Sequence, residues 1–197
     1  MSPFELVAVL LAVAYLVLVI RENIWCWPAA LGSTLLSLIV FADARLYMES
    51  ALQVFYAAMA VYGWHQWLRG GSRGEGVAIE VWPWRRHVIA IGAILALSGV
   101  SGALLAAGTD AALPYLDSFT TIAALVTTYM VAKKILENWL YWLVIDSVSI
   151  YLYISRELFL FAALFAGYLV LIVIGYRTWQ RQWRAERSGD EVSSGAH

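Results

Sequence analysis

Residues 61–67, VYGWHQW, have a similar counterpart 112 positions later, VIGYRTW at residues 173–179. A second pair of similar segments, ENIWCW at residues 22–27 and ENWLYW at residues 137–142, occurs in the same order at an offset of 115. Between the members of each copy lies an arginine, Arg45 or Arg156, at an offset of 111. Matching segments in the same order predict an internal duplication, with short insertions in loops accounting for the drift in offset.

The segments between these motifs are strongly apolar. Of the 197 residues, 62% are hydrophobic and 14% are charged, and the mean hydropathy is +0.72, whereas a soluble domain is nearer half apolar and a quarter charged. The apolar residues form runs of roughly 17 to 21, long enough to span a bilayer, and backbone groups in lipid must hydrogen-bond within a helix. The sequence therefore predicts an all-α integral membrane protein with seven transmembrane helices, at residues 4–20, 24–42, 50–68, 88–108, 113–132, 139–155 and 158–176.

The duplication groups these helices. The first three match the last three, and four crossings separate the copies, so both copies point the same way in a parallel 3+1+3 repeat. A polar end starting at Arg184 is expected to be disordered. The predicted parts are a first three-helix bundle, a Gly-rich and charged cytoplasmic loop, a linker helix, a second three-helix bundle and a cytoplasmic tail, at residues 4–68, 69–87, 88–108, 113–176 and 177–197.

Basic residues predict the orientation. With seven crossings, all of the thirteen Lys and Arg residues except Arg45 and Arg156 fall on one side. The positive-inside rule makes that side cytoplasmic and places the N-terminus outside. The ten tryptophans lie at or near the cytoplasmic helix ends, and an interfacial aromatic belt accounts for most of them.

Polar side chains form a stripe along the sixth helix, where Trp139, Trp142, Asp146, Ser149 and Tyr153 recur at helical spacing. The matching stripe of the second helix is Trp27, Ala30, Thr34, Ser37 and Phe41. A charge at the bilayer centre costs about 2.5–3.5 kcal/mol even on lenient scales, so the carboxylate must face protein or water. With no Lys or Arg at that depth, its partner is a nearby hydroxyl, its own proton or a cationic ligand.

Two other helices add candidates for ligand contact. These are Gln53, Tyr56, Ala60 and Trp64 in the third helix and Asp117, Ser118, Thr121 and Thr128 in the fifth. Each also has a structural interpretation: membrane hydroxyls often bond their own helix, and Gln53 is placed to reach headgroups. Asn138 and Asn23 are expected to be N-caps of the sixth and second helices. Aromatic faces, an amide and a carboxylate together suit a flat cationic ring, on which indoles stack.

The sequence lacks the residues and motifs that a disulfide, a metal site or a hydrolytic enzyme requires. The single cysteine, Cys26, forms no internal disulfide and has no companion for a metal site. The chain has neither HExxH nor GxSxG, and His65, His87 and His197 are not paired with a buried acid by spacing. We therefore expect no enzyme, no metal and no cofactor. The first apolar run lacks the features of a cleaved signal peptide and is expected to be retained. Asp146 leaves proton coupling open as an alternative.

The motifs resemble those of PnuC-type vitamin transporters, especially the members that carry nicotinamide riboside. The resemblance runs from about Ile24 to Trp179 and is carried by NIWCWP (23–28), LQVFYAAMAVYGWHQWLRG (52–70), DSFTT (117–121) and KKILENWLYW (133–142). It implies a SWEET-like 3+1+3 fold with a different helix order within each bundle. It also implies a homotrimer in a bacterial inner membrane, facilitated diffusion of nicotinamide riboside, and trapping by intracellular phosphorylation.

By position, the resemblance favours Gln53, Trp139, Trp142 and Asp146 as substrate contacts, with Asn138 near the inner gate. Nicotinamide riboside is a pyridinium cation with a ribose and a carboxamide, which agrees with the chemistry of the stripe. Relatives that carry thiamine or riboflavin remain alternatives. The predicted substrate-binding residues are Gln53, Tyr56, Trp64, Thr121, Thr128, Asn138, Trp139, Trp142, Asp146 and Ser149.

Overall fold

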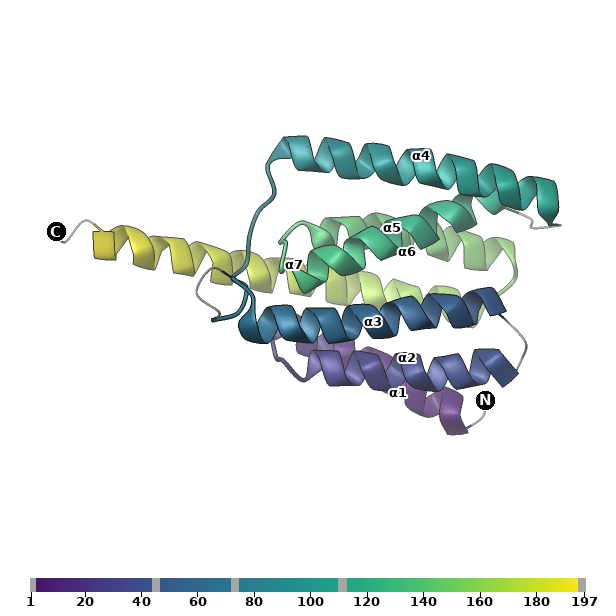
Figure 1. The fold of residues 1–197 in the computed structure, drawn as a ribbon, viewed down its shortest axis with the longest axis horizontal. Coiled ribbons are helices and arrows are strands. Elements are labelled where there is room, and N and C mark those ends of the chain that lie inside the picture. Colours follow the sequence, from purple (N-terminus) through teal and green to yellow (C-terminus); the bar gives the residue numbers. More distant parts are fainter. Residues whose placement is uncertain (1–2, 44–46, 72–74, 110–112, 195–197) are drawn as a thin grey trace. The chain divides into compact units, whose positions relative to one another are not determined.

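The computed structural model describes residues 3–43, 47–71, 75–109 and 113–194. These residues form seven α-helices (Figure 1). Their bounds are α1 Pro3–Ile20, α2 Cys26–Asp43, α3 Tyr47–Arg69, α4 Trp84–Gly108, α5 Pro114–Ala132, α6 Asn138–Ser155 and α7 Phe159–Ser194. The prediction of an all-helical chain with seven helices at these positions is confirmed. Arg45 lies outside the described residues, so its correspondence with Arg156 stays a prediction.

Two of the described helical segments are long and apolar enough to cross a membrane by length and composition alone. They are Trp84–Gly108 and Phe161–Ser188, while Val7–Ile20 and Cys26–Val40 are apolar but shorter. Polar residues such as Gln53 in α3 and Asp146 in α6 lower the apolarity of the helices that carry the predicted site.

Helix starts follow from the four prolines. Pro3 and Pro114 are the first residues of α1 and α5, Pro28 lies in the first turn of α2, and Pro83 precedes α4. Proline is tolerated there because the first N–H groups of a helix have no intrahelical acceptor, and its fixed φ angle suits the first turn.

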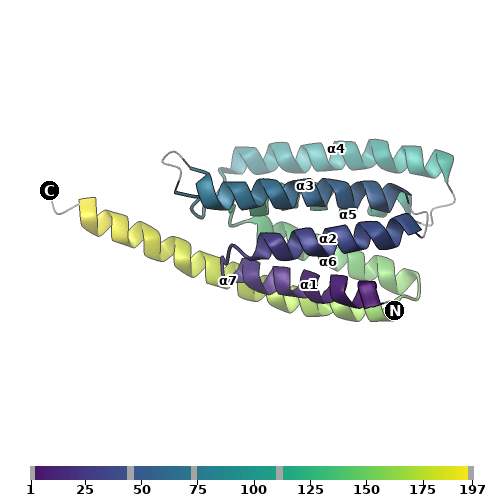
Figure 2. The same ribbon diagram turned by 60° about the horizontal axis from the view of Figure 1, so that its bottom comes forward.

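The predicted disorder from Arg184 onward is wrong, because α7 continues without a break to Ser194 (Figure 2). Arg184, Ala185, Glu186 and Arg187 are good helix formers, and the segment extends an existing helix, so no new nucleation is needed. The guanidinium of Arg187 also lies 5.0 Å from the ring of Trp183, one turn earlier. Polarity alone is a poor predictor of disorder where helix propensity is high.

The chain divides into two compact units. Unit 1 comprises Met1–Ile79 and Ala132–Lys134, and unit 2 comprises Glu80–Val131 and Ile135–His197. In unit 1, α2 packs against both α1 and α3. The hydroxyl of Ser33 in α2 donates a hydrogen bond of 2.9 Å to the carbonyl of Ala8 in α1.

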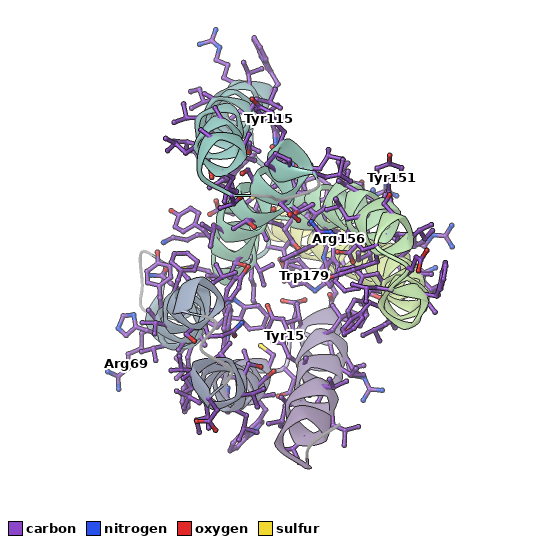
Figure 3. The ribbon with its side chains drawn as sticks, turned by 90° about the vertical axis from the view of Figure 1, so that its right-hand side faces the viewer. Tyr15, Arg69, Tyr115, Tyr151, Arg156 and Trp179 are labelled. Atoms are coloured by element: carbon purple, nitrogen blue, oxygen red, sulfur yellow. The ribbon has the colours of Figure 1, made fainter. Side chains whose placement is uncertain are left out.

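In unit 2, α6 packs against α7, and α4 meets α5 along small residues. Gly102 of α4 lies so close to Tyr115 that an added Cβ would be 2.5 Å from the tyrosine ring, and Figure 3 shows this tyrosine beside α4. Ser118 donates to Ser101 at 3.2 Å. Small side chains thus bring these two helices together, as is common in membrane proteins.

The segment before α4 is more ordered than the predicted exposed loop over residues 69–87. Helix α4 begins at Trp84, so His87 is helical. The carbonyl of Glu80 accepts a 2.8 Å hydrogen bond from the N–H of Leu136, and Glu137 accepts one of 3.3 Å from the N–H of Trp82. The segment before α4 is therefore hydrogen-bonded to the connection between α5 and α6.

Candidate functional site

One face of α6 is buried and polar. Asn138, Trp139, Asp146 and Ser149 are all buried, and Trp142 is half-buried. Their spacing places them on one side of the helix, and they include five of the ten predicted site residues. The face lies within unit 2.

Asp146 is the only charged side chain that is buried among the described residues, with 5% of its surface exposed. No hydrogen bond or ion pair joins its carboxylate to another described residue. Asp146 interacts electrostatically with the hydroxyl groups of Tyr153 and Tyr168. An isolated buried carboxylate is costly, so Asp146 requires neutralisation, either by its own proton or by a cation that the described side chains do not supply.

Trp139 is buried in a way that leaves little room for a stacked ligand. Only 1% of its surface is exposed, and its ring packs edge-on against Trp179 with the centroids 5.4 Å apart. A Cβ added at Gly175 would lie 2.5 Å from the Trp139 ring, so the glycine forms a seat for the indole. Trp142 instead packs beside the cluster of Ile94, Ala123 and Ile145 and keeps part of its surface open.

Unit 1 contains the same arrangement. Trp27 packs edge-on against Trp67 with the centroids 5.5 Å apart, and a Cβ at Gly63 would lie 2.2 Å from the Trp27 ring. Each residue of this cluster is 112 positions before its counterpart in unit 2. Four of the ten tryptophans therefore lie in two buried clusters rather than in an interfacial belt.

The constant offset of 112 corrects the predicted alignment of ENIWCW with ENWLYW at 115. At the helix ends, the N–H of Asn23 donates to the carbonyl of Leu18, and the N–H of Ile135 donates to that of Met130, both at 2.9 Å. These bonds place Asn23 opposite Ile135 rather than opposite Asn138. The shared Glu-Asn letters occur three residues apart in the two structural repeats.

The predicted N-cap role of Asn138 is wrong, because the cap of α6 is Glu137 and Asn138 is already helical. The side-chain amide of Asn138 donates to the carbonyl of Ile135 at 2.7 Å, while its buried Oδ1 has no described partner. Asn23 behaves more as predicted, since its Oδ1 accepts a 3.0 Å hydrogen bond from the N–H of Trp25 just before α2.

The candidates of α3 belong to unit 1. Gln53 and Tyr56 are half-buried, whereas Trp64 is 38% exposed and lines a shallow hollow with Val61 and Leu68. At the end of the same helix, Arg69 points away from the protein (Figure 3). The structure gives no support for Trp64 as a buried ligand contact.

The candidates of α5 behave mostly as helix constituents. Thr128 is buried, but its hydroxyl donates to the carbonyl of Ala124 in its own helix at 2.8 Å, and Thr121 is exposed. Asp117 forms an ion pair with Arg156, and both are partly exposed. This ion pair connects the start of α5 to the end of α6.

An apolar hollow of about 300 Å³ lies between α4, α5 and α6. Its walls include Ile91, Leu95, Phe119 and Val144. None of the predicted site residues lines it, and its walls hold no acidic or amide side chain, with Tyr141 the one lining residue that carries a polar side-chain atom. The buried polar face of α6 is therefore the better candidate site.

Sequence reasoning missed a polar cluster at the start of α6. His87 Nδ1 and the Tyr141 hydroxyl are 3.0 Å apart, and His87 Nε2 lies 3.8 Å from Glu137 Oε1. The histidine and the glutamate are separated by 50 positions, so no local spacing pairs them. The KKILENWLYW motif pointed to the segment but not to its partner.

The chain is similar to known transporters in sequence and in fold. The family model described as nicotinamide mononucleotide transporter matches residues 2–181. The riboflavin/roseoflavin transporter RibM of Streptomyces davaonensis is 27% identical over 98% of this chain and 90% of its own. The nicotinamide riboside transporter PnuC of Escherichia coli K12 is 27% identical over 72% of this chain and 70% of its own. A crystal structure of the vitamin B3 transporter PnuC superimposes with a TM-score of 0.70 at 22% identity, covering 90% of this chain and 80% of that chain.

Proposed function

Because the chain belongs to the nicotinamide mononucleotide transporter family, we propose that it carries nicotinamide riboside across the membrane by facilitated diffusion. Intracellular phosphorylation of the riboside traps it after entry. The observation that carries this proposal is the buried, unpaired carboxylate of Asp146 on a polar helix face. A pyridinium cation supplies the missing positive charge.

The substrate contacts in this proposal are Asn138, Trp142, Asp146 and Ser149 of α6. Gln53 and Tyr56 of α3 stay candidates from the sequence alone. The half-buried indole of Trp142 stacks on the pyridinium ring. Asn138 is fully buried, so its Oδ1, which has no described partner, becomes available to the carboxamide or a ribose hydroxyl only when the site opens. Trp139 acts through its packing on Trp179, because its ring has little free surface.

The transport mechanism in this proposal is alternating access by a parallel 3+1+3 repeat. The two matched clusters of Gly, Trp and Trp at an offset of 112 support the duplication. Movement of one three-helix bundle against the other would expose the site to each side in turn. In this proposal the protein is a homotrimer in the bacterial inner membrane, as the resemblance to PnuC-type transporters implies. Its N-terminus is outside and its C-terminus in the cytoplasm, as the basic residues indicate.

The charge of the substrate is the criterion by which this proposal chooses among the compounds that the relatives carry. Riboflavin is neutral and gives Asp146 no counter-ion, and the mononucleotide places a phosphate near a buried acid without a buried Lys or Arg in the described chain. Thiamine is also a flat cation and is the second candidate. A neutral flavin could offer the carboxylate hydrogen bonds from its ribityl hydroxyls, but no positive charge.

The deciding experiment is a binding screen on purified protein in nanodiscs by isothermal titration calorimetry. Nicotinamide riboside should bind at least about tenfold more tightly than riboflavin or nicotinamide mononucleotide, since a desolvated charge pair is worth more than about 1.4 kcal/mol. Tighter binding of riboflavin would refute the riboside assignment, and tighter binding of thiamine would favour the second candidate.

Facilitated diffusion makes a separate prediction for uptake. Proteoliposomes should equilibrate nicotinamide riboside to the outside concentration and no further, and an imposed proton or sodium gradient should not change the final level. Accumulation above that level, driven by either gradient and without phosphorylation, would show ion coupling, with Asp146 as the candidate proton carrier.

A further inference from the structure

Glu22 and Lys134 hold equivalent positions in the two repeats and bind each other. Each residue follows the first helix of its repeat, since α1 ends at Ile20 and α5 at Ala132, and the two are 112 positions apart. Their charges are opposite, and Lys134 Nζ donates to Glu22 Oε2 at 2.8 Å. Equivalent positions with complementary charges are not required by a simple duplication.

The backbone at both positions favours glycine. Glu22 has a φ angle of +50° and Lys134 one of +49°, the left-handed conformation that closes a helix and that glycine adopts without cost. A side chain there costs about 1 kcal/mol or more. Both positions nevertheless carry a charged residue, which indicates that the side chains have a role.

The pair is largely shielded from water. The side chains of Glu22 and Lys134 are 16% and 14% exposed, and the ammonium group also lies 4.7 Å from the ring of Trp67. The neighbouring Lys133 donates to Gln66 at 2.9 Å. Two lysines thus attach this short segment to α3 and to the end of α1.

The segment that carries Lys134 belongs to a different unit from the residues on either side of it. Ala132–Lys134 belongs to unit 1, whereas the residues directly before and after it, Val131 and Ile135, belong to unit 2. Movement of unit 2 against unit 1 must therefore either carry this segment along, breaking its contacts, or bend the chain at its two ends.

We propose that the Glu22–Lys134 ion pair is a lock at the predicted cytoplasmic ends of the helices, closed in this structure and opened once in every transport cycle. The proposal rests on the alternating-access function proposed above. Glu22 and Lys134 are positioning residues that set the balance between two states and do not touch the substrate.

The first test needs no substrate and uses the protein's own thiol as reporter. Cys26 is fully buried at the start of α2, four residues after Glu22, and should react slowly with a water-soluble methanethiosulfonate. The Glu22→Gln variant keeps the lysine over Trp67 but loses the ion pair, and should label about tenfold faster, as expected for the loss of a shielded ion pair.

The charge-swapped variant, Glu22→Lys with Lys134→Glu, should return the labelling rate toward that of the wild type. Arg21→Gln is the matched control, because Arg21 is the exposed neighbour of Glu22, and its rate should not change. Wild-type labelling of Cys26 in both Glu22→Gln and Lys134→Gln would overturn the proposal.

The second test separates a lock from a permanent structural bond. Glu22→Cys and Lys134→Cys are combined in a Cys26→Ala background and joined with a reducible bifunctional methanethiosulfonate. Uptake of nicotinamide riboside should fall in proportion to the crosslinked fraction and recover on reduction. Undiminished uptake by crosslinked protein would show that the pair never opens. If the wild type takes up no riboside, the proposed substrate fails, while the Cys26 labelling rates still decide whether the lock exists.

Discussion

The Asp146→Asn variant is expected to bind nicotinamide riboside at least about 30-fold more weakly than the wild type, because removing one member of a desolvated charge pair costs about 2 kcal/mol or more. The buried carboxylate has no ion-pair or hydrogen-bond partner among the described residues, so the ligand is the group that loses its counter-charge. Asparagine keeps the size and polarity of the side chain.

The stability of the ligand-free Asp146→Asn variant should be unchanged or higher, although its affinity for the riboside is lower. Because Asp146 is buried and unpaired, its replacement by a neutral amide removes a desolvation cost. The unfolding temperature of Asp146→Asn without ligand should therefore equal or exceed that of the wild type. Weaker binding together with an unchanged or higher unfolding temperature separates a ligand contact from a structural one.

Two controls sharpen this test. Asp117→Asn removes a carboxylate of α5 that is partly exposed and paired with Arg156, and it should leave affinity within about twofold. Reduced nicotinamide riboside has nearly the same shape but a neutral ring, so it should bind the wild type weakly and gain nothing from Asp146. Calorimetry that finds equal affinity for the riboside in wild type and Asp146→Asn would exclude charge neutralisation at this residue.

The second large effect is expected at the glycine seats. Gly175→Ala should lower stability by about 3 kcal/mol, the upper end of overpacking costs, because its Cβ would lie 2.5 Å from the buried Trp139 ring. The ring is held against Trp179 on another side, so it has no free space into which it can move. An unfolding temperature lower by roughly 6–12 °C is expected.

The structural duplication predicts the same result in unit 1. Gly63→Ala places a Cβ 2.2 Å from the Trp27 ring and should destabilise the protein to a similar extent. Gly167→Ala is the matched control, because it lies in α7 like Gly175 but has open space around it; it should be neutral or slightly stabilising, as alanine is the better helix former. Thermal unfolding followed by tryptophan fluorescence measures all three, and equal unfolding temperatures for Gly175→Ala and Gly167→Ala would refute the seat.

Local sequence signals were sufficient to predict where the helices lie, because helix formation depends mainly on residues that are close together in the sequence. Apolar runs placed α1, α2, α5 and α6 within two residues of their observed bounds. The same reasoning failed for the end of α7, where a polar segment was taken for a disordered one although it continues a helix that is already formed. The polar stripe of α6 was also a local pattern. The sequence required its acid to face protein or water, and in the structure Asp146 is buried.

The sequence by itself determined the set of helices and the isolated acid at residue 146, and it predicted the duplication, since each depends on residues within one helix or on a comparison of two segments of sequence. Only the tertiary structure decided the true offset of 112, the seating of Trp139 on Gly175 and the pairing of Glu22 with Lys134. Those features join side chains from distant segments, and their energies depend on packing distance and burial, which no spacing along the chain encodes.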